Sequence, residues 1–129
     1  MESFKLSIIL PASPEELYKA WLSSKQHGAF TGAKATVSAK VNGKFRAWDG
    51  YISGKNRELI ADKKIVQAWR TSEFNQDAPD SIVEITFEPK GKKTKINLYH
   101  NNLQKGDAKK YKDGWKKYYF EPMKKYFKE

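Results

Sequence analysis

The chain has 129 residues, a formal net charge of +10 and no cysteine. This length suits one domain, and the lack of cysteine excludes disulfide bonds and thiolate chemistry. The sequence opens without a basic segment followed by an apolar core, and no apolar run approaches the roughly 20 residues of a membrane span, so we expect a single cytoplasmic domain over residues 1–129.

The first third of the sequence predicts a strand followed by two short helices. Apolar residues alternate with polar ones over residues 4–10, which indicates a strand with one buried face. Residues 13–16, Ser-Pro-Glu-Glu, form a helix start with a serine cap, a proline in the first turn and a glutamate that completes a capping box. The inward stripe of this helix is expected to be Leu17, Ala20 and Trp21. A second short helix or turn over residues 25–30 is expected to end near Gly32.

The middle of the sequence predicts about six strands joined by tight turns. Alternation over residues 35–41 leads to Asn42-Gly43, a two-residue hairpin signal, and a return strand over residues 44–48. Asp49-Gly50 is a second turn of this kind. The next strand spans residues 51–60, and Gly54 within it indicates a bulge or bend.

Three further strands complete the predicted sheet. Asp62-Lys63 turns the chain into a strand with Ile65, Gln67, Trp69 and Thr71 on one face. A polar loop over residues 74–80 leads to a strand over residues 81–88, a turn over residues 89–91 and a last strand over residues 93–99. Hairpin connections of this length imply antiparallel pairing.

Residues 108–127 predict a long helix with an unusually aromatic face. At about 100° per residue, one face collects Tyr111, Trp115, Tyr118, Tyr119, Pro122, Met123 and Tyr126. Pro122 removes the amide that would bond the Tyr118 carbonyl, so we expect a kink there. So much aromatic surface requires a large apolar partner, and we predict that the helix packs across the sheet in an α+β fold.

Short motifs occur in order along most of the chain: Phe30-Thr31-Gly32, Gly43-Lys44-Phe45, Asp49-Gly50 with Ile52-Ser53-Gly54, Glu58-Leu59, Ile65-Val66-Gln67 with Trp69-Arg70, and Gly114-Trp115 with Tyr118-Tyr119-Phe120. In order and spacing they resemble the C-terminal domain of activators of heat-shock protein 90 ATPase, in the START-like helix-grip (SRPBCC) superfamily. The resemblance implies a curved antiparallel sheet of six to seven strands, two short N-terminal helices and one long C-terminal helix packed across the sheet.

The resemblance implies a non-enzymatic, co-chaperone-like binding protein. The two-domain activators carry a separate N-terminal domain that this sequence lacks, so chaperone binding is expected more than ATPase stimulation. Residues 104–129 contain nine lysines and four acidic residues, a net charge of +5 that suits an acidic partner. The lysines expected to contact such a partner lie opposite the aromatic face: Lys110, Lys117, Lys124 and Lys128.

Other classes of function find little support in the sequence. His27 and His100 lack cysteine or carboxylate partners at metal-binding spacing, so we expect structural roles and no metal, cofactor or catalytic residue. We do not expect nucleic acid as a partner, because lysine dominates over arginine and no nucleic-acid-binding motif occurs.

The alternative function is a carrier or sensor of a small apolar ligand. Members of the helix-grip superfamily often hold such ligands between the long helix and the sheet, and aromatic residues with a few polar groups suit this role. The candidate lining residues are Trp48, Trp69, Arg70, Phe87, Tyr99, Trp115, Tyr118 and Tyr119. Their bulk predicts a reduced pocket, and most of them are also explained as ordinary core.

Overall fold

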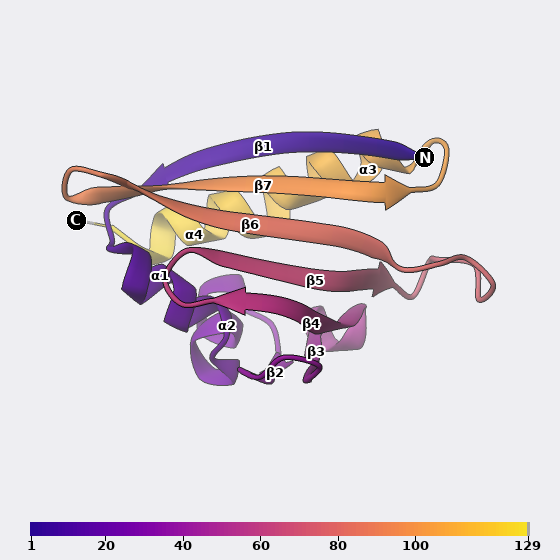
Figure 1. Cartoon of the computed structure of the whole chain (residues 1–129), viewed down its shortest axis with the longest axis horizontal. Helices are drawn as coiled ribbons and strands as arrows, with labels where there is room; N and C mark the ends of the chain where they lie inside the picture. The colour runs from indigo at the N-terminus through magenta and orange to yellow at the C-terminus, as the bar shows by residue number, and fades with distance from the viewer. Residues whose placement is uncertain (129) are drawn as a thin grey trace.

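A computed structural model describes residues 1–128 of the chain as one sheet with helices packed on a single face (Figure 1). In chain order the elements are β1 (Glu2–Leu10), α1 (Pro14–Trp21), α2 (Ser24–Thr31), β2 (Thr36–Val37), β3 (Lys44–Ala47), the 3-10 turn η1 (Trp48–Gly50), β4 (Ile52–Ile60), β5 (Lys64–Thr71), β6 (Ser81–Lys90), β7 (Lys93–Leu103), α3 (Asp107–Trp115), the π-helical turn η2 (Lys116–Phe120) and α4 (Glu121–Tyr126).

The seven strands are antiparallel in the order β1-β7-β6-β5-β4-β3-β2. The first strand therefore joins the last at one edge, and the rest of the sheet is a simple meander. The C-terminal helix (α3, η2 and α4) runs behind the sheet, and α1 and α2 cover one end of the same face (Figure 1). This arrangement confirms the predicted α+β helix-grip fold.

The two predicted N-terminal helices are confirmed, and each has a serine cap. The Ser13 side chain accepts a hydrogen bond from the Glu16 amide, and the Glu16 side chain accepts one from the Ser13 amide, which completes the capping box. Ser23 caps α2, and Gly32 ends this helix with a φ of 80°. Leu17, Ala20 and Trp21 are buried as predicted.

The strand predicted over residues 35–41 is wrong beyond its first residues, because β2 contains only Thr36 and Val37. The side chain of Asn56, which is fully buried, donates to the carbonyls of Ser38 and Lys40 at 2.7 and 3.0 Å. These carbonyls therefore accept hydrogen bonds from a side chain instead of from the backbone amides of a neighbouring strand. The turn is also displaced: the Gly43 amide donates to the Lys40 carbonyl at 3.0 Å, and Asn42 has a positive φ of 68°.

Gly54 marks a close approach of two strands and not the predicted bulge, which lies between Asn56 and Glu58. A Cβ at position 54 would lie 1.8 Å from the Ala68 carbonyl oxygen and 2.9 Å from the Phe45 ring. We expect Gly54→Ala to lower the free energy of unfolding by about 3 kcal/mol, the upper end of the range for overpacking, since the clash is with backbone. Urea denaturation measures this change. A loss below about 0.5 kcal/mol, the range of neutral surface changes, would contradict it.

Two predicted boundaries in the second half of the sheet are also shifted. β6 continues through Pro89 to Lys90, so the turn comes later and is centred on Gly91, with a φ of 62°. Thr86 is the last residue of β6 that pairs with β5. Pro89 lies beyond it, where β6 pairs with β7 alone, and proline is tolerated in a strand that has a neighbour on one side only. β7 extends past Tyr99 to Leu103 because it pairs with β1 along this length.

The C-terminal helix contains a π-helical turn that the 100° periodicity does not predict. Within it the Glu121 amide donates to the Lys116 carbonyl five residues earlier, directly before Pro122, which has no amide hydrogen. The extra residue rotates the following face, so Phe120 is buried although the periodicity placed it elsewhere. Tyr118 and Tyr126, predicted to face inward, are instead 48% and 45% exposed.

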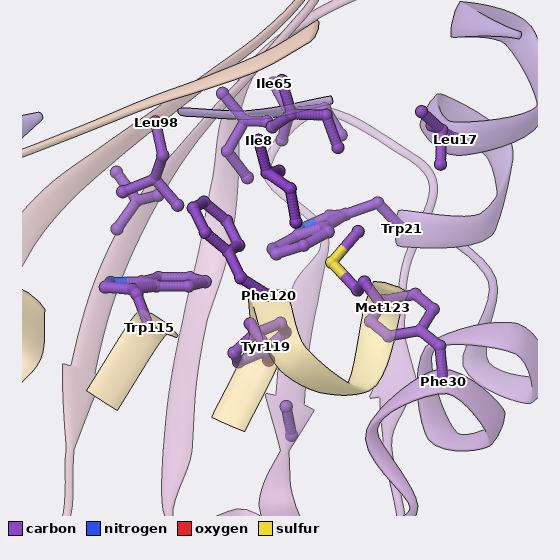
Figure 2. Close-up of a cluster of buried hydrophobic side chains, with 14 of the residues drawn as sticks. Ile8, Leu17, Trp21, Phe30, Ile65, Leu98, Trp115, Tyr119, Phe120 and Met123 are labelled. Atoms are coloured by element: carbon purple, nitrogen blue, oxygen red, sulfur yellow. The ribbon is translucent and has the colours of Figure 1, made fainter. Parts of the chain in front are cut away.

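Aromatic rings fill the space between this helix and the sheet (Figure 2). Trp115 and Trp21 stack with their centroids 6.0 Å apart, and Tyr119 lies 4.6 Å from Trp115 and 5.1 Å from Trp21. Phe120 points from this layer toward Leu98 and Ile8 of the sheet, and Met123 lies between Trp21 and Phe30 (Figure 2). The core is therefore solid beneath the middle of the helix, and open space lies to one side.

Candidate functional site

A pocket of about 430 Å³ opens between the C-terminal helix and the connection from β3 to β4. Aromatic side chains form most of its wall, and a carboxylate and an ammonium group lie among them. The lining residues are Trp48, Tyr51, Ile52, Trp69, Glu73, Lys110, Tyr111, Gly114, Trp115, Tyr118 and Tyr119. A cavity of this size and character is typical of a binding site.

Five of the eight predicted lining residues border this pocket: Trp48, Trp69, Trp115, Tyr118 and Tyr119. The other three, Arg70, Phe87 and Tyr99, lie elsewhere. Arg70 and Tyr99 are on the outer face because successive residues of a strand point to opposite sides. Phe87 faces inward but packs beneath α1, where its ring lies 5.9 Å from that of Tyr18.

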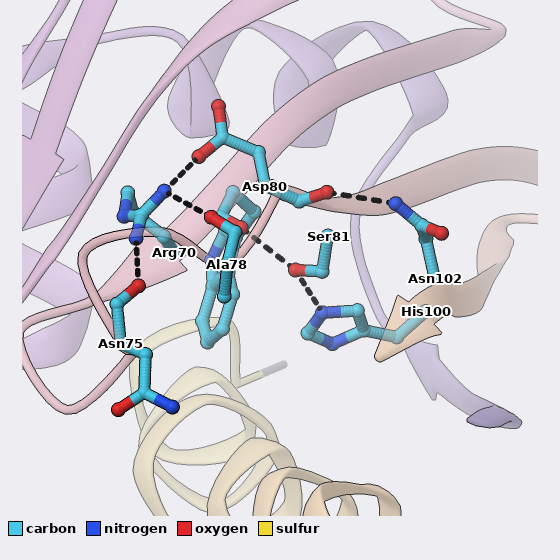
Figure 3. Close-up of polar contacts among 8 residues, drawn as sticks. Arg70, Asn75, Ala78, Asp80, Ser81, His100 and Asn102 are labelled. Atoms are coloured by element: carbon cyan, nitrogen blue, oxygen red, sulfur yellow. Dashed lines mark hydrogen bonds and ion pairs between the residues drawn. The ribbon is translucent and has the colours of Figure 1, made fainter. Parts of the chain in front are cut away.

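Arg70 instead fastens the loop between β5 and β6 (Figure 3). Its guanidinium is 2.8 Å from the Asp80 carboxylate and donates to the carbonyls of Ala78 and Asn75 at 3.2 and 2.9 Å. Tyr99 contacts Lys5, whose ammonium nitrogen lies 5.3 Å from the ring centroid. Both residues therefore have structural contacts away from the pocket.

A short polar network lies at the mouth of the pocket. The Tyr51 hydroxyl donates to the Glu73 carboxylate, which is also 2.8 Å from the Lys110 ammonium. The hydrogen bond from Lys110 holds the pKa of Glu73 below its ordinary value, and desolvation followed by the Glu73 bond raises the pKa of Tyr51. Glu73 is therefore a carboxylate whose charge is matched by one lysine. Glu73 was not predicted from the sequence, because it and Tyr51 lie on different sides of β5 along the chain and meet only in the fold.

The wall opposite the helix is a strained turn. Trp48, Asp49 and Gly50 have φ values of 53°, 57° and 92°, a conformation that is unfavourable for the first two residues. The Asp49 amide donates to the Lys34 carbonyl at 3.1 Å, which helps to hold the turn. The Trp48 indole lies 5.5 Å from the Tyr118 ring, and its Nε1 is shielded from water without an acceptor among residues 1–128.

His100 is buried beside the pocket in a chain of hydrogen bonds (Figure 3). The Trp115 indole donates to its Nδ1 at 3.0 Å, and its Nε2 lies 2.8 Å from the Ser81 hydroxyl, which donates to the Trp69 carbonyl. This pattern fixes the neutral ring with its proton on Nε2. Desolvation lowers the pKa of His100 to about 3.

His27 is buried on the other side of the aromatic layer. Its Nδ1 donates to the Trp21 carbonyl at 2.9 Å, and its Nε2 accepts from the Tyr119 hydroxyl at 2.8 Å. Burial lowers the pKa of His27 to about 4. Both histidines therefore orient aromatic side chains. Among residues 1–128, no group of three or more His, Asp or Glu side chains is placed to hold a metal ion.

The four lysines predicted to contact a partner are all exposed. Lys110 is bound to Glu73, and the Lys117 ammonium lies 5.3 Å from the Tyr118 ring centroid, so these two lie beside the pocket. Lys124 is 3.7 Å from Glu121, and Lys128 follows the last helical turn. In the described part of the chain, no helix is both long and apolar enough to cross a membrane.

Comparison with known proteins places this fold among one group of relatives. The family model described as "Activator of Hsp90 ATPase homolog 1-like protein" matches residues 11–128. The human activator of 90 kDa heat shock protein ATPase homolog 1 is 33% identical over 115 residues, which are 89% of this chain and 34% of that protein. The homologue from Dictyostelium discoideum is 29% identical over 98% of the chain and 33% of its own length. The chain thus spans about a third of the length of these curated relatives.

Solved structures give the same result. An HSP90 activator from Plasmodium falciparum superimposes with a TM-score of 0.85 at 28% identity, covering 94% of this chain and 92% of that one. The Aha1 dimer from Colwellia psychrerythraea has a TM-score of 0.79 at 15% identity, covering 95% and 94% of the two chains. The second likeness supports the fold alone.

Proposed function

Because this chain belongs to the Activator of Hsp90 ATPase homolog 1-like family, we propose that it is a single helix-grip domain that binds heat-shock protein 90 in a co-chaperone-like, non-enzymatic role. The match of the family model over residues 11–128 carries this proposal. The solved Plasmodium falciparum chain called an HSP90 activator supports it, because 92% of that chain is covered by this one.

The electrostatics of the C-terminal helix support an acidic partner. Lys117, Lys124 and Lys128 are exposed on a chain whose net charge is +10. Exposed charges of one sign speed the encounter with a partner of the opposite sign and add less to the affinity of the final complex. The proposal therefore includes a salt-sensitive association rate.

The direct test is titration of the purified chain into full-length heat-shock protein 90, with binding followed by calorimetry and ATP hydrolysis measured in parallel. Binding at low ionic strength, on the order of 0.05 M, is the expected result. Stimulated hydrolysis would extend the role from binding to activation. No detectable binding at this ionic strength would remove the proposed function.

The lysine surface gives a separate prediction. Replacing Lys117, Lys124 and Lys128 together by glutamine is expected to lower the association rate constant about tenfold at low salt, with a smaller effect on the dissociation rate. Stopped-flow measurements at increasing salt should show the difference shrinking as the charges are screened. A matched triple variant on β3 and β4, K44Q/K55Q/R57Q, carries the same change of net charge. An equal loss in both triple variants would assign the effect to overall charge and contradict a specific lysine surface.

The pocket favours a second candidate function, the carrying or sensing of a small apolar ligand. Its volume of about 430 Å³ and its aromatic wall suit such a molecule. Native mass spectrometry of the freshly purified chain tests this candidate, and a co-purifying molecule is the expected result. A spectrum that contains only the free protein, with no thermal shift from apolar compounds, would count against it.

A further inference from the structure

Gly114 has no packing reason to be glycine. It lies inside α3 and lines the pocket, and a Cβ added there would meet no atom within 4 Å. Glycine in a helix interior costs about 1 kcal/mol relative to alanine. Gly114 lowers helix stability and leaves free space at the pocket wall. Its presence is explained if a bound group occupies that space.

Two other parts of the pocket wall also have unfavourable local structure. A π-helical turn contributes Tyr118 and Tyr119, and Trp48, which has a positive φ like its neighbour Asp49, also lines the pocket. Wide π turns and left-handed non-glycine residues concentrate at functional sites, where surrounding structure holds them in place. Three independent departures from the most stable backbone therefore meet at one pocket.

The mouth of the pocket has the chemistry of a protein contact. Tyr118 and Tyr51 are 48% and 37% exposed, and Trp48 lies behind them. Tyrosine and tryptophan around a concave site are the residues that dominate binding energy at protein interfaces. A side chain of the partner that enters the pocket would be enclosed by rings on several sides.

The charges at the mouth favour an acidic partner. Lys110 lines the opening, Lys117 lies about two helical turns further along against the lining residue Tyr118, and Glu73 is the carboxylate among the lining residues. The Lys110 ammonium offsets the charge of Glu73, and Lys117 and the net charge of +10 add a positive field for an approaching segment. Negative charge on either side of an apolar anchor complements this arrangement.

From these observations, we propose that the pocket is the slot in which an aromatic or large aliphatic side chain, carried on an acidic segment of a partner protein, is bound. This inference rests on the proposed function when the partner is heat-shock protein 90, and it names where on this chain that partner docks. Gly114 keeps the slot open, Trp48, Tyr118 and Trp115 enclose the anchor, and Lys117 attracts its acidic flanks.

The test compares the affinity of full-length heat-shock protein 90 for the wild-type chain and for variants that fill or open the slot. Gly114→Leu adds a side chain to the free space and improves helix propensity, so it is expected to fold and to weaken binding at least tenfold. Gly114→Ala adds one carbon to the same position and is the folding control only: it is expected to raise the melting temperature and to weaken binding less than Gly114→Leu does.

Tyrosines of similar exposure provide a second matched pair. Tyr118→Ala removes a wall of the slot and is expected to weaken binding about tenfold or more. Tyr126→Ala changes the same residue type on the same helix, at 45% exposure, away from the slot, and is expected to leave binding within about twofold. If the chaperone binds but Gly114→Leu and Tyr118→Ala match their controls, the slot is wrong while the proposed function stands.

A probe independent of the chaperone separates the two failures. The probes are a capped acidic pentapeptide with a central tryptophan, its central-alanine analogue, a lysine-flanked version and free indole, each followed by the ¹H–¹⁵N signals of the tryptophan indoles. The acidic tryptophan peptide is expected to bind at least tenfold more tightly than the other three and to shift the Trp48 signal. Equal binding of indole would identify a small-molecule site and overturn the slot, as would the absence of peptide binding.

Discussion

Replacing Trp115 with alanine is expected to lower the free energy of unfolding by about 4–5 kcal/mol, the largest effect of any single substitution considered for this chain. The indole is 97% buried, since only 3% of it is exposed, and it lies 6.0 Å from Trp21 and 5.8 Å from Trp69. Alanine would leave a large cavity at the centre of the aromatic layer. It would also remove the donor to His100 Nδ1 and leave a buried acceptor unpaired.

Trp115→Phe separates these two contributions. Phenylalanine keeps an aromatic ring in the layer but has no N–H group for His100, so its expected cost is about 2 kcal/mol, between those of a lost hydrogen bond and a cavity. Urea denaturation of the wild type and both variants gives the comparison, with unchanged m-values as the check on two-state unfolding. A loss below about 2 kcal/mol in Trp115→Ala would show that the layer collapses onto the gap, and the structural role assigned to Trp115 would be wrong.

The sequence predicted the sheet and the helices wherever local pattern decides the structure. Residues 65–71 alternate cleanly, and β5 buries the predicted face. The prediction failed where a distant side chain decides. Asn56 takes the carbonyls of Ser38 and Lys40, and no periodicity in residues 35–41 can reveal a bond formed 16 to 18 residues away.

The C-terminal helix shows a second kind of limit. A fixed 100° per residue is an adequate rule for α3, and it places Tyr111 and Trp115 on the buried face. After Lys116 the rule is right for Tyr119 and Met123, which are buried, but wrong for Tyr118 and Tyr126, which are exposed, because the π-helical turn inserts a residue. Pro122 indicated that the regular hydrogen bonding of the helix is interrupted near Tyr118. The sequence did not indicate that the change would be a wider turn that buries Phe120.

The sequence predicted part of the candidate site: five of the eight predicted lining residues border the pocket. Large aromatic residues on strands and on the helix are natural candidates for a lining, and Trp48, Trp69 and Trp115 were found in this way. Which face of a strand is buried depends on the pairing register, which the sequence does not give. For this reason Tyr99 was wrongly predicted to face the pocket. Gly114 carried a signal that was available in the sequence: a glycine inside a helical pattern needs a reason.

Acidification from pH 7 to pH 5 is expected to lower the free energy of unfolding by about 2 kcal/mol for each of the two buried histidines, about 4 kcal/mol in all. The pKa of His27 falls from 6.5 to about 4 and that of His100 from 6.5 to about 3 on folding, because burial disfavours the charged ring. The unfolded chain therefore binds more protons than the folded chain below pH 6.5. The stabilisation is complete above this pH and is lost as the pH falls toward the folded values.

Protonation of the carboxylates also lowers the free energy of unfolding, but at a lower pH. Ion-paired side chains such as Glu73 and Asp113 have pKa values below their ordinary ones of 4.5 and 3.8, so their stabilisation is lost only as the pH falls below that range. Urea denaturation at closely spaced values between pH 7 and 5 therefore isolates the histidines. His27→Gln is expected to halve the change over this window whatever its effect on stability at pH 7.

The geometry makes this expectation specific to neutral rings. Protonation of His100 would place a second N–H group at Nδ1, against the N–H of Trp115. Protonation of His27 would place one at Nε2, against the Tyr119 hydroxyl, whose own proton would have to rotate away. The Tyr119 hydroxyl can turn to accept, whereas the indole N–H cannot. His100 should therefore resist protonation more strongly, and its NMR titration should lie below that of His27. A titration of either ring near pH 6.5 in the folded chain would contradict both the burial and the hydrogen-bond directions assigned to it.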